Sequence, residues 1–430
     1  MLKRNLLYTL TLFLLLGFLQ TANAQQFITR PIELSGELVG APYRIRVPRG
    51  WNGTLLLYAH GYRDKADHPG EVDNRAADVA PSAALEPVLL AQGYALAGSA
   101  YRDNGWAVQE GIEDMKNLAL FFRQRVGNPD NTILWGFSMG TVISFASIER
   151  YPELYDGALC ACAVGAGSPQ SWDSAGDLLL AYDQLFGVPQ SWGTPGNVRN
   201  DLDFETEVQP KLTAEVSNQA NFPKFEFIRL VAGTPGRGIM PPAPPAFYPG
   251  WVFTDMFFTT EARAELERRA RGPIVQNLNR NYNLTAQEKA YLVSLGIPEP
   301  IIDDWLVALN AQRNIFAPYY SRFYLKRNAE YTGLIESPVL TLHTLYDPLV
   351  TVSQEREYAE TVAAANRSNL LYQTYTNANG HCNFTGEQLV TSVIAINNWV
   401  VSGTRPTAAN FPTTLGFLPE SFVPPPMNQP

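Results

Sequence analysis

The feature that most constrains this chain is a serine between two glycines, in the run Gly136-Phe137-Ser138-Met139-Gly140. The apolar residues 133–135 before it are typical of a buried strand, and residues 141–148 after it are compatible with a helix. A turn this tight requires a strained backbone at the serine, and small residues two positions away let the strand and the helix approach each other. The sequence therefore predicts that the Ser138 hydroxyl stands clear at the N-terminus of a helix.

A serine in this position is suited to nucleophilic attack. The backbone N–H of Met139, at the start of the helix, is placed to stabilise an oxyanion. A second N–H is expected from Tyr62, because His60-Gly61-Tyr62 follows the apolar run 55–58, and His60 itself is expected to brace that loop. The alternative is a glycine-rich turn of a nucleotide-binding fold, but neither Gly-x-Gly-x-x-Gly nor Gly-Lys-Ser/Thr occurs at this turn.

The N-terminus has the features of a secretory signal. Lys3 and Arg4 precede an apolar run over residues 6–19, and Ala22-Asn23-Ala24 comes before Gln25. The apolar run is shorter than the roughly 20 residues needed to span a bilayer. We therefore expect a cleaved signal peptide over residues 1–24, no membrane anchor, and a secreted or periplasmic protein of bacterial origin.

The composition argues against several classes of partner. The formal net charge of −9 becomes −11 once the two positive charges of Lys3 and Arg4 leave with the signal. An acidic chain without a basic run is a poor partner for nucleic acid or anionic membranes. The four histidines are too few and too scattered for a structural zinc site, and neither a metal ion nor an organic cofactor is predicted.

Strand-like and helix-like segments alternate on both sides of a long irregular region. The expected strands cover 43–47, 55–58, 94–101, 133–135, 157–165, 339–345 and 369–375, and the expected helices cover 82–92, 111–126, 141–148, 353–366 and 387–401. This alternation implies a parallel sheet with right-handed crossovers.

The irregular region is rich in aromatic residues, proline and glycine, with helical pieces at 260–271, 285–294 and 301–312. Because strands return after it, we expect an inserted, mostly helical cap rather than an independent second domain. The expected organisation is a core of residues 25–165 and 336–403, a cap of residues 166–335 and a Pro-rich tail of residues 404–430.

A serine nucleophile needs an imidazole base, which a carboxylate orients. His68 falls in a polar loop and His343 within an expected strand, whereas His381 lies in a glycine-containing loop just past a strand end. Elimination therefore favours His381 as the base.

The candidate acid is Asp347, which ends the preceding strand and is followed by Pro348. The alternative is that Asp347 only caps the next helix, in which case Asp173 or Asp177 would supply the carboxylate. The resulting order of serine, acid and histidine is Ser138, Asp347, His381.

With these motifs the chain resembles the α/β-hydrolase superfamily over residues 27–165 and 337–401. The resemblance rests on His60-Gly61, on Gly136–Gly140, on Asp347 and on Gly380-His381. It implies an α/β fold with an eight-stranded, mostly parallel sheet, helices on both faces, a variable cap after the sixth strand, and an acyl-enzyme formed on Ser138.

The three cysteines allow at most one intrachain disulfide, and we expect it to join Cys160 or Cys162 to Cys382. Feruloyl esterases and tannases, which are also secreted members of the superfamily with large insertions, pair a cysteine before the serine with one after the histidine. The chain resembles them in part, because Cys382 follows His381, but Phe137 precedes Ser138.

The leading interpretation is a secreted serine hydrolase that cleaves carboxylic esters of a small, apolar or aromatic molecule. Tyr101 and Trp106 are the candidate substrate contacts. A peptidase with the same three residues is the second interpretation, with Glu261 or Glu265 holding a substrate amine. A non-catalytic binding protein on the same scaffold is the third, but such proteins usually lose the serine or the histidine, and both are present here.

Overall fold

The computed structural model describes residues 28–240 and 244–427. The expected signal peptide, residues 1–24, lies outside this part of the chain. Within the described residues, no helix is both long enough and apolar enough to cross a membrane.

Eight strands form one sheet in the order β1-β2-β4-β3-β5-β6-β9-β10. Their bounds are β1 Ile32–Leu38, β2 Ala41–Val47, β3 Thr54–Ala59, β4 Ala95–Ser99, β5 Asn131–Phe137, β6 Gly157–Ala161, β9 Val339–Tyr346 and β10 Leu371–Asn379. β2 runs antiparallel to both of its neighbours, and all the other pairs are parallel. The predicted eight-stranded, mostly parallel sheet is therefore confirmed.

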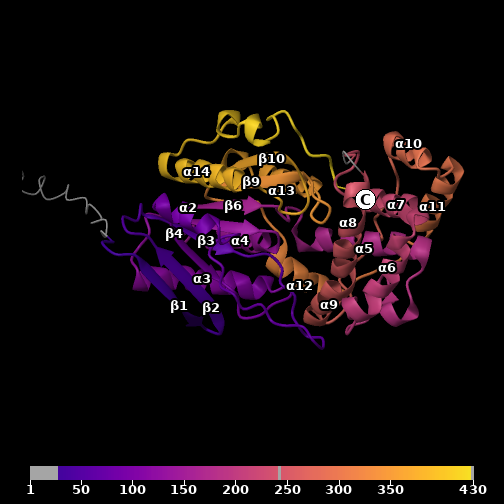
Figure 1. Ribbon diagram of the computed structural model, residues 1–430, viewed down its shortest axis with the longest axis horizontal. Coiled ribbons are helices and arrows are strands. Elements are labelled where there is room, and N and C mark those ends of the chain that lie inside the picture. Colours follow the sequence, from indigo (N-terminus) through magenta and orange to yellow (C-terminus); the bar gives the residue numbers. More distant parts are fainter. Residues whose placement is uncertain (1–27, 241–243, 428–430) are drawn as a thin grey trace, which may run out of the picture.

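Helices cover both faces of this sheet (Figure 1). The helices that pack on it or follow its strands are α2 Leu85–Ala91, α3 Val108–Arg125, α4 Met139–Arg150, α13 Ser353–Ala364 and α14 Gly386–Ser402. The alternation of β3 explains the two layers, because Leu55 and Leu57 join the core with α3 and α4, whereas Leu56 and Tyr58 join the core with α2 and α14.

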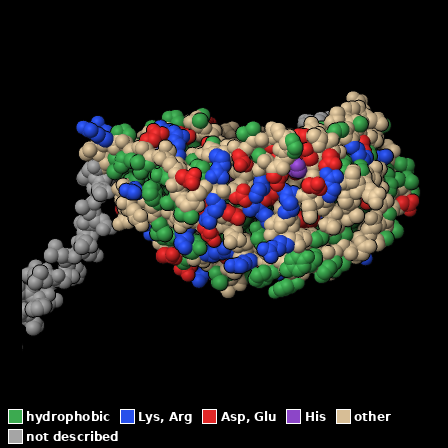
Figure 2. Space-filling view, turned by 90° about the horizontal axis from the view of Figure 1, so that it is seen from below, with side chains coloured by type: hydrophobic (Ala, Val, Ile, Leu, Met, Phe, Trp, Pro, Cys, Tyr) green, Lys and Arg blue, Asp and Glu red, His purple; other side chains and the backbone are tan. Residues whose placement is uncertain are grey.

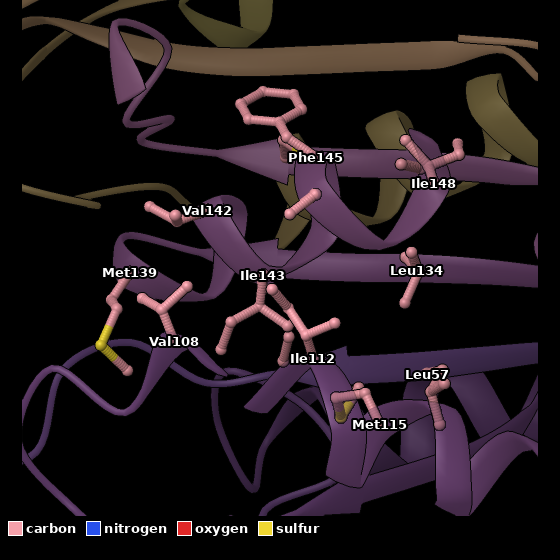
Figure 3. Packing of buried hydrophobic residues seen from close by; sticks show 14 of the residues in the cluster. Leu57, Val108, Ile112, Met115, Leu134, Met139, Val142, Ile143, Phe145 and Ile148 are labelled. Carbon is pink, nitrogen blue, oxygen red and sulfur yellow. The ribbon is translucent and has the colours of Figure 1, made fainter. Parts of the chain in front are cut away.

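The core under α4 is the closest support of the serine turn. α3 places Ile112 and Met115 toward Ile143 of α4, while Leu57 and Leu134 approach from the sheet (Figure 3). All five side chains are at most 2% exposed. Burying an aliphatic side chain of this size contributes about 1.5–3 kcal/mol, so this layer holds α4 firmly against the strands.

The region between β6 and β9 is a helical insertion, which we define as residues 167–329. Its helices lie together at one end of the sheet (Figure 1). They are α5 Gly167–Phe186, α6 Gln209–Ser217, α7 Phe222–Ala232, α8 Pro244–Phe257, α9 Arg263–Ala270, α10 Ala286–Ser294, α11 Glu299–Ala311 and α12 Tyr319–Ala329. Two π-helical turns, η2 Phe204–Val208 and η4 Phe258–Ala262, precede α6 and α9.

The helical insertion has a hydrophobic core of its own, to which α5, α7 and α11 contribute Leu180, Phe227 and Leu309. It also contains a short antiparallel hairpin whose strands, β7 Gly193–Thr194 and β8 Asn197–Val198, have two residues each. The expected helices at 260–271, 285–294 and 301–312 correspond to η4 with α9, to α10 and to α11. Sequence reasoning missed α5, α6, α7, α8 and α12, because proline and aromatic residues obscure their periodicity.

The C-terminal residues run along the outer edge of the sheet. Phe417 forms a bridge with Thr376 of β10, and the Leu418 N–H donates to the Tyr375 carbonyl at 2.8 Å. Phe411 stacks on Tyr372. The expected Pro-rich tail is thus packed against β10 through its first half.

Ion pairs join the helical insertion to the loops of the sheet. Arg269 of α9 pairs with Asp103 and Glu110, and Arg268 pairs with Asp67. Figure 2 shows acidic and basic side chains interspersed across the middle of one face of the molecule. Such partly exposed pairs contribute little each, but together they connect the insertion to the loops of the sheet.

Candidate active site

Ser138 occupies the turn between β5 and α4, with a φ of 53°. A non-glycine residue at positive φ is uncommon and marks a strained turn. The glycines on either side have no room for a side chain, because a Cβ on Gly136 would lie 2.5 Å from the Gly140 carbonyl oxygen and one on Gly140 would lie 2.0 Å from the Ala59 carbonyl oxygen. The small residues are therefore required by the approach of β5 to α4 and of α4 to β3.

The structure brings the three sequence-predicted residues Ser138, His381 and Asp347 together. The Ser138 Oγ lies 2.8 Å from His381 Nε2, and His381 Nδ1 lies 2.8 Å from Asp347 Oδ2. His381 follows β10 and Asp347 follows β9, so the ends of two neighbouring strands carry the two side chains. The geometry allows the imidazole to accept the serine proton while the carboxylate holds its other nitrogen.

Asp347 is fully buried and satisfied. Its Oδ1 accepts hydrogen bonds from the N–H groups of Leu349 and Val350. Burial would raise its pKa, but His381 and His343 more than offset this, and the pKa of Asp347 stays below its ordinary value. The carboxylate is therefore charged at neutral pH and can orient His381.

A second histidine, His343, lies against the same carboxylate. Its Nε2 donates to the Val350 carbonyl at 2.9 Å and lies 3.8 Å from Asp347 Oδ2, while its Nδ1 faces Glu355 Oε1 at 3.2 Å. Burial opposes the charged form, but Glu355 and Asp347 raise the pKa of His343 above its ordinary value. Sequence reasoning placed His343 in a strand and missed this contact, which no local pattern indicates.

A disulfide joins Cys162, just past β6, to Cys382, the residue after His381. It selects one of the two expected pairings, and Cys160 remains a buried free thiol. The histidine loop is also held by the Thr344 hydroxyl, which donates to the Gly380 carbonyl at 2.8 Å. The disulfide thus links the histidine loop to Cys162 after β6, and not to residue 137, which directly precedes the serine.

The loop after β3 lies directly beside Ser138. A Cβ on Gly61 would lie 3.2 Å from the Ser138 Cβ. Among the described residues, the N–H groups of Tyr62 and Met139 have no hydrogen-bond acceptor, so both are free to bind an oxyanion. His60 is buried and stacks on Tyr101, and burial lowers its pKa to about 3, so it is neutral and braces the loop.

A largely apolar cavity opens at Ser138, with a volume of about 770 Å³ including its solvent-filled mouth. Trp106 and Tyr62 line one side, and Trp172 and Phe258 come from the helical insertion. A concave, largely apolar pocket with a few polar groups is typical of small-molecule sites. Of the two predicted substrate contacts, Trp106 lines the cavity, whereas Tyr101 lies beneath His60 and donates its hydroxyl to the His60 carbonyl.

Comparison with known proteins gives one relative by sequence and many structures. No model of a known protein family matches the chain. An o-phthalyl amidase from Xanthobacter agilis is 22% identical over 441 residues, which cover 86% of this chain and 87% of the amidase.

Among solved structures, an esterase from Aspergillus oryzae is 11% identical with a TM-score of 0.41, covering 87% of this chain and 80% of that one. An epoxide hydrolase from Vigna radiata is 12% identical with a TM-score of 0.39, covering 87% of this chain and 99% of that one.

The strand order, with a glycine-flanked serine after β5 and an acid and a histidine after the last two strands, decides the fold. The chain has the α/β-hydrolase fold. The helical insertion follows the sixth strand of its sheet, as the resemblance implied.

Among the described residues of the helical insertion, Asp255 of α8 is the one ionisable group that lines the cavity. It is 6% exposed, and neither carboxyl oxygen has a hydrogen-bond partner among the described residues. Burial, and then the charge of Asp347, raise the pKa of Asp255 well above its ordinary value. The raised pKa favours the protonated form of the group, which can donate a hydrogen bond into the cavity. Sequence reasoning missed it, because α8 was not predicted.

The alternative acids have other partners. Asp173 pairs with Arg322, and Asp177 pairs with Arg280 and accepts from the Tyr282 hydroxyl, all within the helical insertion. Neither replaces Asp347. Glu265, a candidate for holding a substrate amine, accepts from the Trp106 N–H and pairs with Arg269, so its carboxylate is already engaged.

Proposed function

We propose that this α/β-hydrolase cleaves carboxylic esters through an acyl-enzyme on Ser138. The observation that carries the proposal is the continuous line of hydrogen bonds from Ser138 through His381 to Asp347, at 2.8 Å each. His381 would take the serine proton during attack, pass it to the leaving group, and then activate the water that releases the acid.

The oxyanion of each tetrahedral intermediate would bind the N–H groups of Tyr62 and Met139. Two such donors in a water-poor site stabilise the developing charge, and losing one costs about 10²–10³ in kcat in other serine hydrolases. The free N–H groups beside Ser138 support this assignment.

The walls of the cavity support an apolar, aromatic acyl group as the substrate. Trp106 and Trp172 meet edge to face, with ring centroids 5.1 Å apart, and Phe258 lies on the same cavity. Aromatic rings prefer such edge and offset contacts, so a flat acyl group is a suitable occupant. The Asp255 carboxyl would donate a hydrogen bond to a polar substituent of that group.

Amide hydrolysis is the second candidate, because the relative that matches 86% of the chain is an amidase. The same groups would act, but His381 would have to protonate a poorer leaving group. A peptidase is less well supported, since Glu265 is already paired.

Export from the cytoplasm is part of the proposal. The basic and apolar N-terminal pattern supports it, and so does the Cys162–Cys382 disulfide, because such bonds persist in oxidising compartments.

Fluorophosphonate labelling with peptide mapping tests the nucleophile. We expect the label on Ser138, and we expect Ser138→Ala to lose about 10⁴–10⁶ in kcat with every substrate. Ser171→Ala is the matched control, because Ser171 lines the same cavity and donates to the Gly167 carbonyl. Labelling of Ser171 instead, or turnover retained in Ser138→Ala, would refute the assignment.

Paired substrates separate the two candidate reactions. A benzoyl aryl ester and the matching benzoyl anilide share the acyl group and differ in the leaving group. An esterase should hydrolyse only the ester at a useful rate, whereas comparable kcat/KM values on the anilide would favour the amidase.

A further inference from the structure

A second group of carboxylates lies where the helical insertion meets the loop after β3. Oxygen atoms of Asp64, Glu71 and Glu261 are all within 4.8 Å of one another. Asp203, Glu205 and Glu261 form a second such set, so Glu261 is shared by both. Asp64 and Glu71 belong to the sheet region, and the other three residues belong to the insertion.

Glu261 is the buried centre of this group. It is 2% exposed, and its Oε2 accepts a hydrogen bond from the Phe204 N–H. Its Oε1 is buried and has no hydrogen-bond partner among the described residues. A buried carboxylate oxygen without a donor is costly, so its presence points to a ligand that supplies positive charge.

The protein does not supply that charge itself. In the described part of the chain, no lysine or arginine forms an ion pair with Asp64, Glu71, Asp203, Glu205 or Glu261. The nearby basic side chains are engaged elsewhere, since Lys65 pairs with Asp103 and Arg268 pairs with Asp67. Several carboxylates therefore share a small volume without a lysine or arginine partner, while the imidazole of the neighbouring His68 lies 3.4 Å from Asp67 and its backbone N–H donates to Glu71.

We propose that a divalent cation of the calcium type binds here, held by Asp64, Glu71 and Glu261, with Asp203 and Glu205 adding negative charge or further ligands. Ca²⁺ prefers six to eight oxygen ligands at about 2.3–2.6 Å, so oxygens on opposite sides of one ion are about 4.6–5.2 Å apart. The observed spacing allows three carboxylates to share one ion. Asp64 and Glu71 are only partly buried, which leaves a path for the ion and for water ligands.

The ion would connect the insertion to the wall of the active-site cavity. The Tyr62 hydroxyl donates to Asp64 Oδ1 at 3.3 Å, and the Tyr62 ring packs edge-on against Phe258, the first residue of the π-helical turn that carries Glu261. Binding of the cation at this junction would hold the loop of Tyr62 and the insertion in one arrangement.

Calcium titration of the full-length mature protein tests the site. After removal of metal with EGTA, calorimetric titration should show one Ca²⁺ bound per chain. Saturating Ca²⁺ should raise the Tm by about 2–4 °C or more, because a ligand that binds only the folded state stabilises it. Absence of both effects would overturn the proposal, as would a response to Mg²⁺ without one to Ca²⁺.

Glu261→Gln is the decisive variant, since it keeps the shape and the acceptor for Phe204 and imitates a protonated glutamate. We expect it to weaken Ca²⁺ binding at least about 10-fold and to abolish the Tm response. If it responds to Ca²⁺ as the unchanged protein does, the group is held by a proton rather than a cation and the proposal fails.

Two further variants guard against a folding defect in Glu261→Gln. Glu71→Gln changes a partly exposed loop residue and should also weaken Ca²⁺ binding about 10-fold or more. Asp201→Asn is the matched control, because Asp201 is an exposed acid that pairs with Arg199 and lies two residues before Asp203. The Ca²⁺ response of this variant should be unchanged. An equal loss in Asp201→Asn would indicate general charge screening and overturn the specific site.

Discussion

The sheet and the helical insertion contribute to the same cavity in different ways. The sheet supplies Ser138, Asp347 and His381 from positions directly after its strands, where hydrogen bonds and packing fix them. The insertion supplies Trp172, Asp255 and Phe258 to the cavity wall, and of these Trp172 and Phe258 pack against the hydrophobic core that the insertion shares with the sheet. The sheet thus supplies the reacting groups and the insertion supplies part of the wall around them, so we expect changes at the reacting groups to affect every substrate and changes in the insertion to affect substrates selectively.

The largest effect should come from the sheet, with Asp347→Asn. Asparagine can still accept from the Leu349 and Val350 N–H groups, so the fold should be retained, but it no longer provides a carboxylate for His381. We expect kcat to fall about 10⁴-fold for all substrates, as when the orienting acid of other serine hydrolases is replaced. Steady-state kinetics and circular dichroism measure the two outcomes.

Asp173→Asn is the matched control for this variant, since Asp173 was the alternative acid and pairs with Arg322. Its kcat should stay within about 10-fold of the unchanged protein. If Asp173→Asn lost activity and Asp347→Asn kept it, the acid that orients His381 would come from the insertion. The sheet would then not supply all three reacting groups.

A smaller and selective effect is expected from the insertion, with Trp172→Ala. Removing the indole takes away one aromatic wall, so the ratio of kcat/KM for a benzoyl ester to that for an acetyl ester of the same alcohol should fall about 10-fold or more. The ratio is insensitive to any loss of folded protein. Trp251→Ala is the control, because Trp251 belongs to the core of the insertion and does not line the cavity. An unchanged ratio in Trp172→Ala would mean that the insertion does not set acyl preference.

The smallest effect concerns stability and separates two buried acids within the insertion. Burial and Asp347 raise the pKa of Asp255 in the folded state, so the folded chain holds this proton more tightly than the unfolded chain. Stability is then lost as the pH rises above the unfolded pKa of about 3.9. Asp255→Asn should therefore unfold at a higher Tm than the unchanged protein at pH 7, and the difference should vanish below about pH 4.

Asp177→Asn is the comparison for Asp255→Asn, because Asp177 is equally buried but bonded to Arg280 and Tyr282. Its loss removes one ion-pair partner of the largely buried Arg280, so this variant should be less stable at pH 7. A Tm difference for Asp255→Asn that does not change with pH would contradict this. It would show that water or another group satisfies the Asp255 carboxyl in the folded protein.

Much of the sheet could be predicted from the sequence because its evidence is local. The glycines around Ser138 predict the turn, and the structure shows which backbone atoms exclude a Cβ there. Asp347 and His381 were found from their places after strand-like runs, since parallel strands bring their carboxyl ends to one edge. The fold follows from such short patterns in chain order.

The insertion could not be predicted to the same depth because its important contacts join distant residues. Asp255 and Trp172 meet at the cavity only when α5 and α8 pack together, and Glu261 meets Asp64 only across the junction with the sheet. No spacing in the sequence encodes these meetings. For the same reason, the few and scattered histidines of the sequence indicated no metal ion, whereas the site we propose uses carboxylates from three separate segments.

The C-terminal segment along β10 has a consequence for solubility. β10 is the last strand of the sheet, and a strand with unpaired N–H and C=O groups on one side is a template for pairing with another chain. The bridge between Thr376 and Phe417, with Tyr372 under Phe411, occupies that side. The proline-rich segment thus covers the edge strand and prevents edge-to-edge association. A chain shortened after α14 would expose the edge of β10 and its hydrophobic side chains to other molecules.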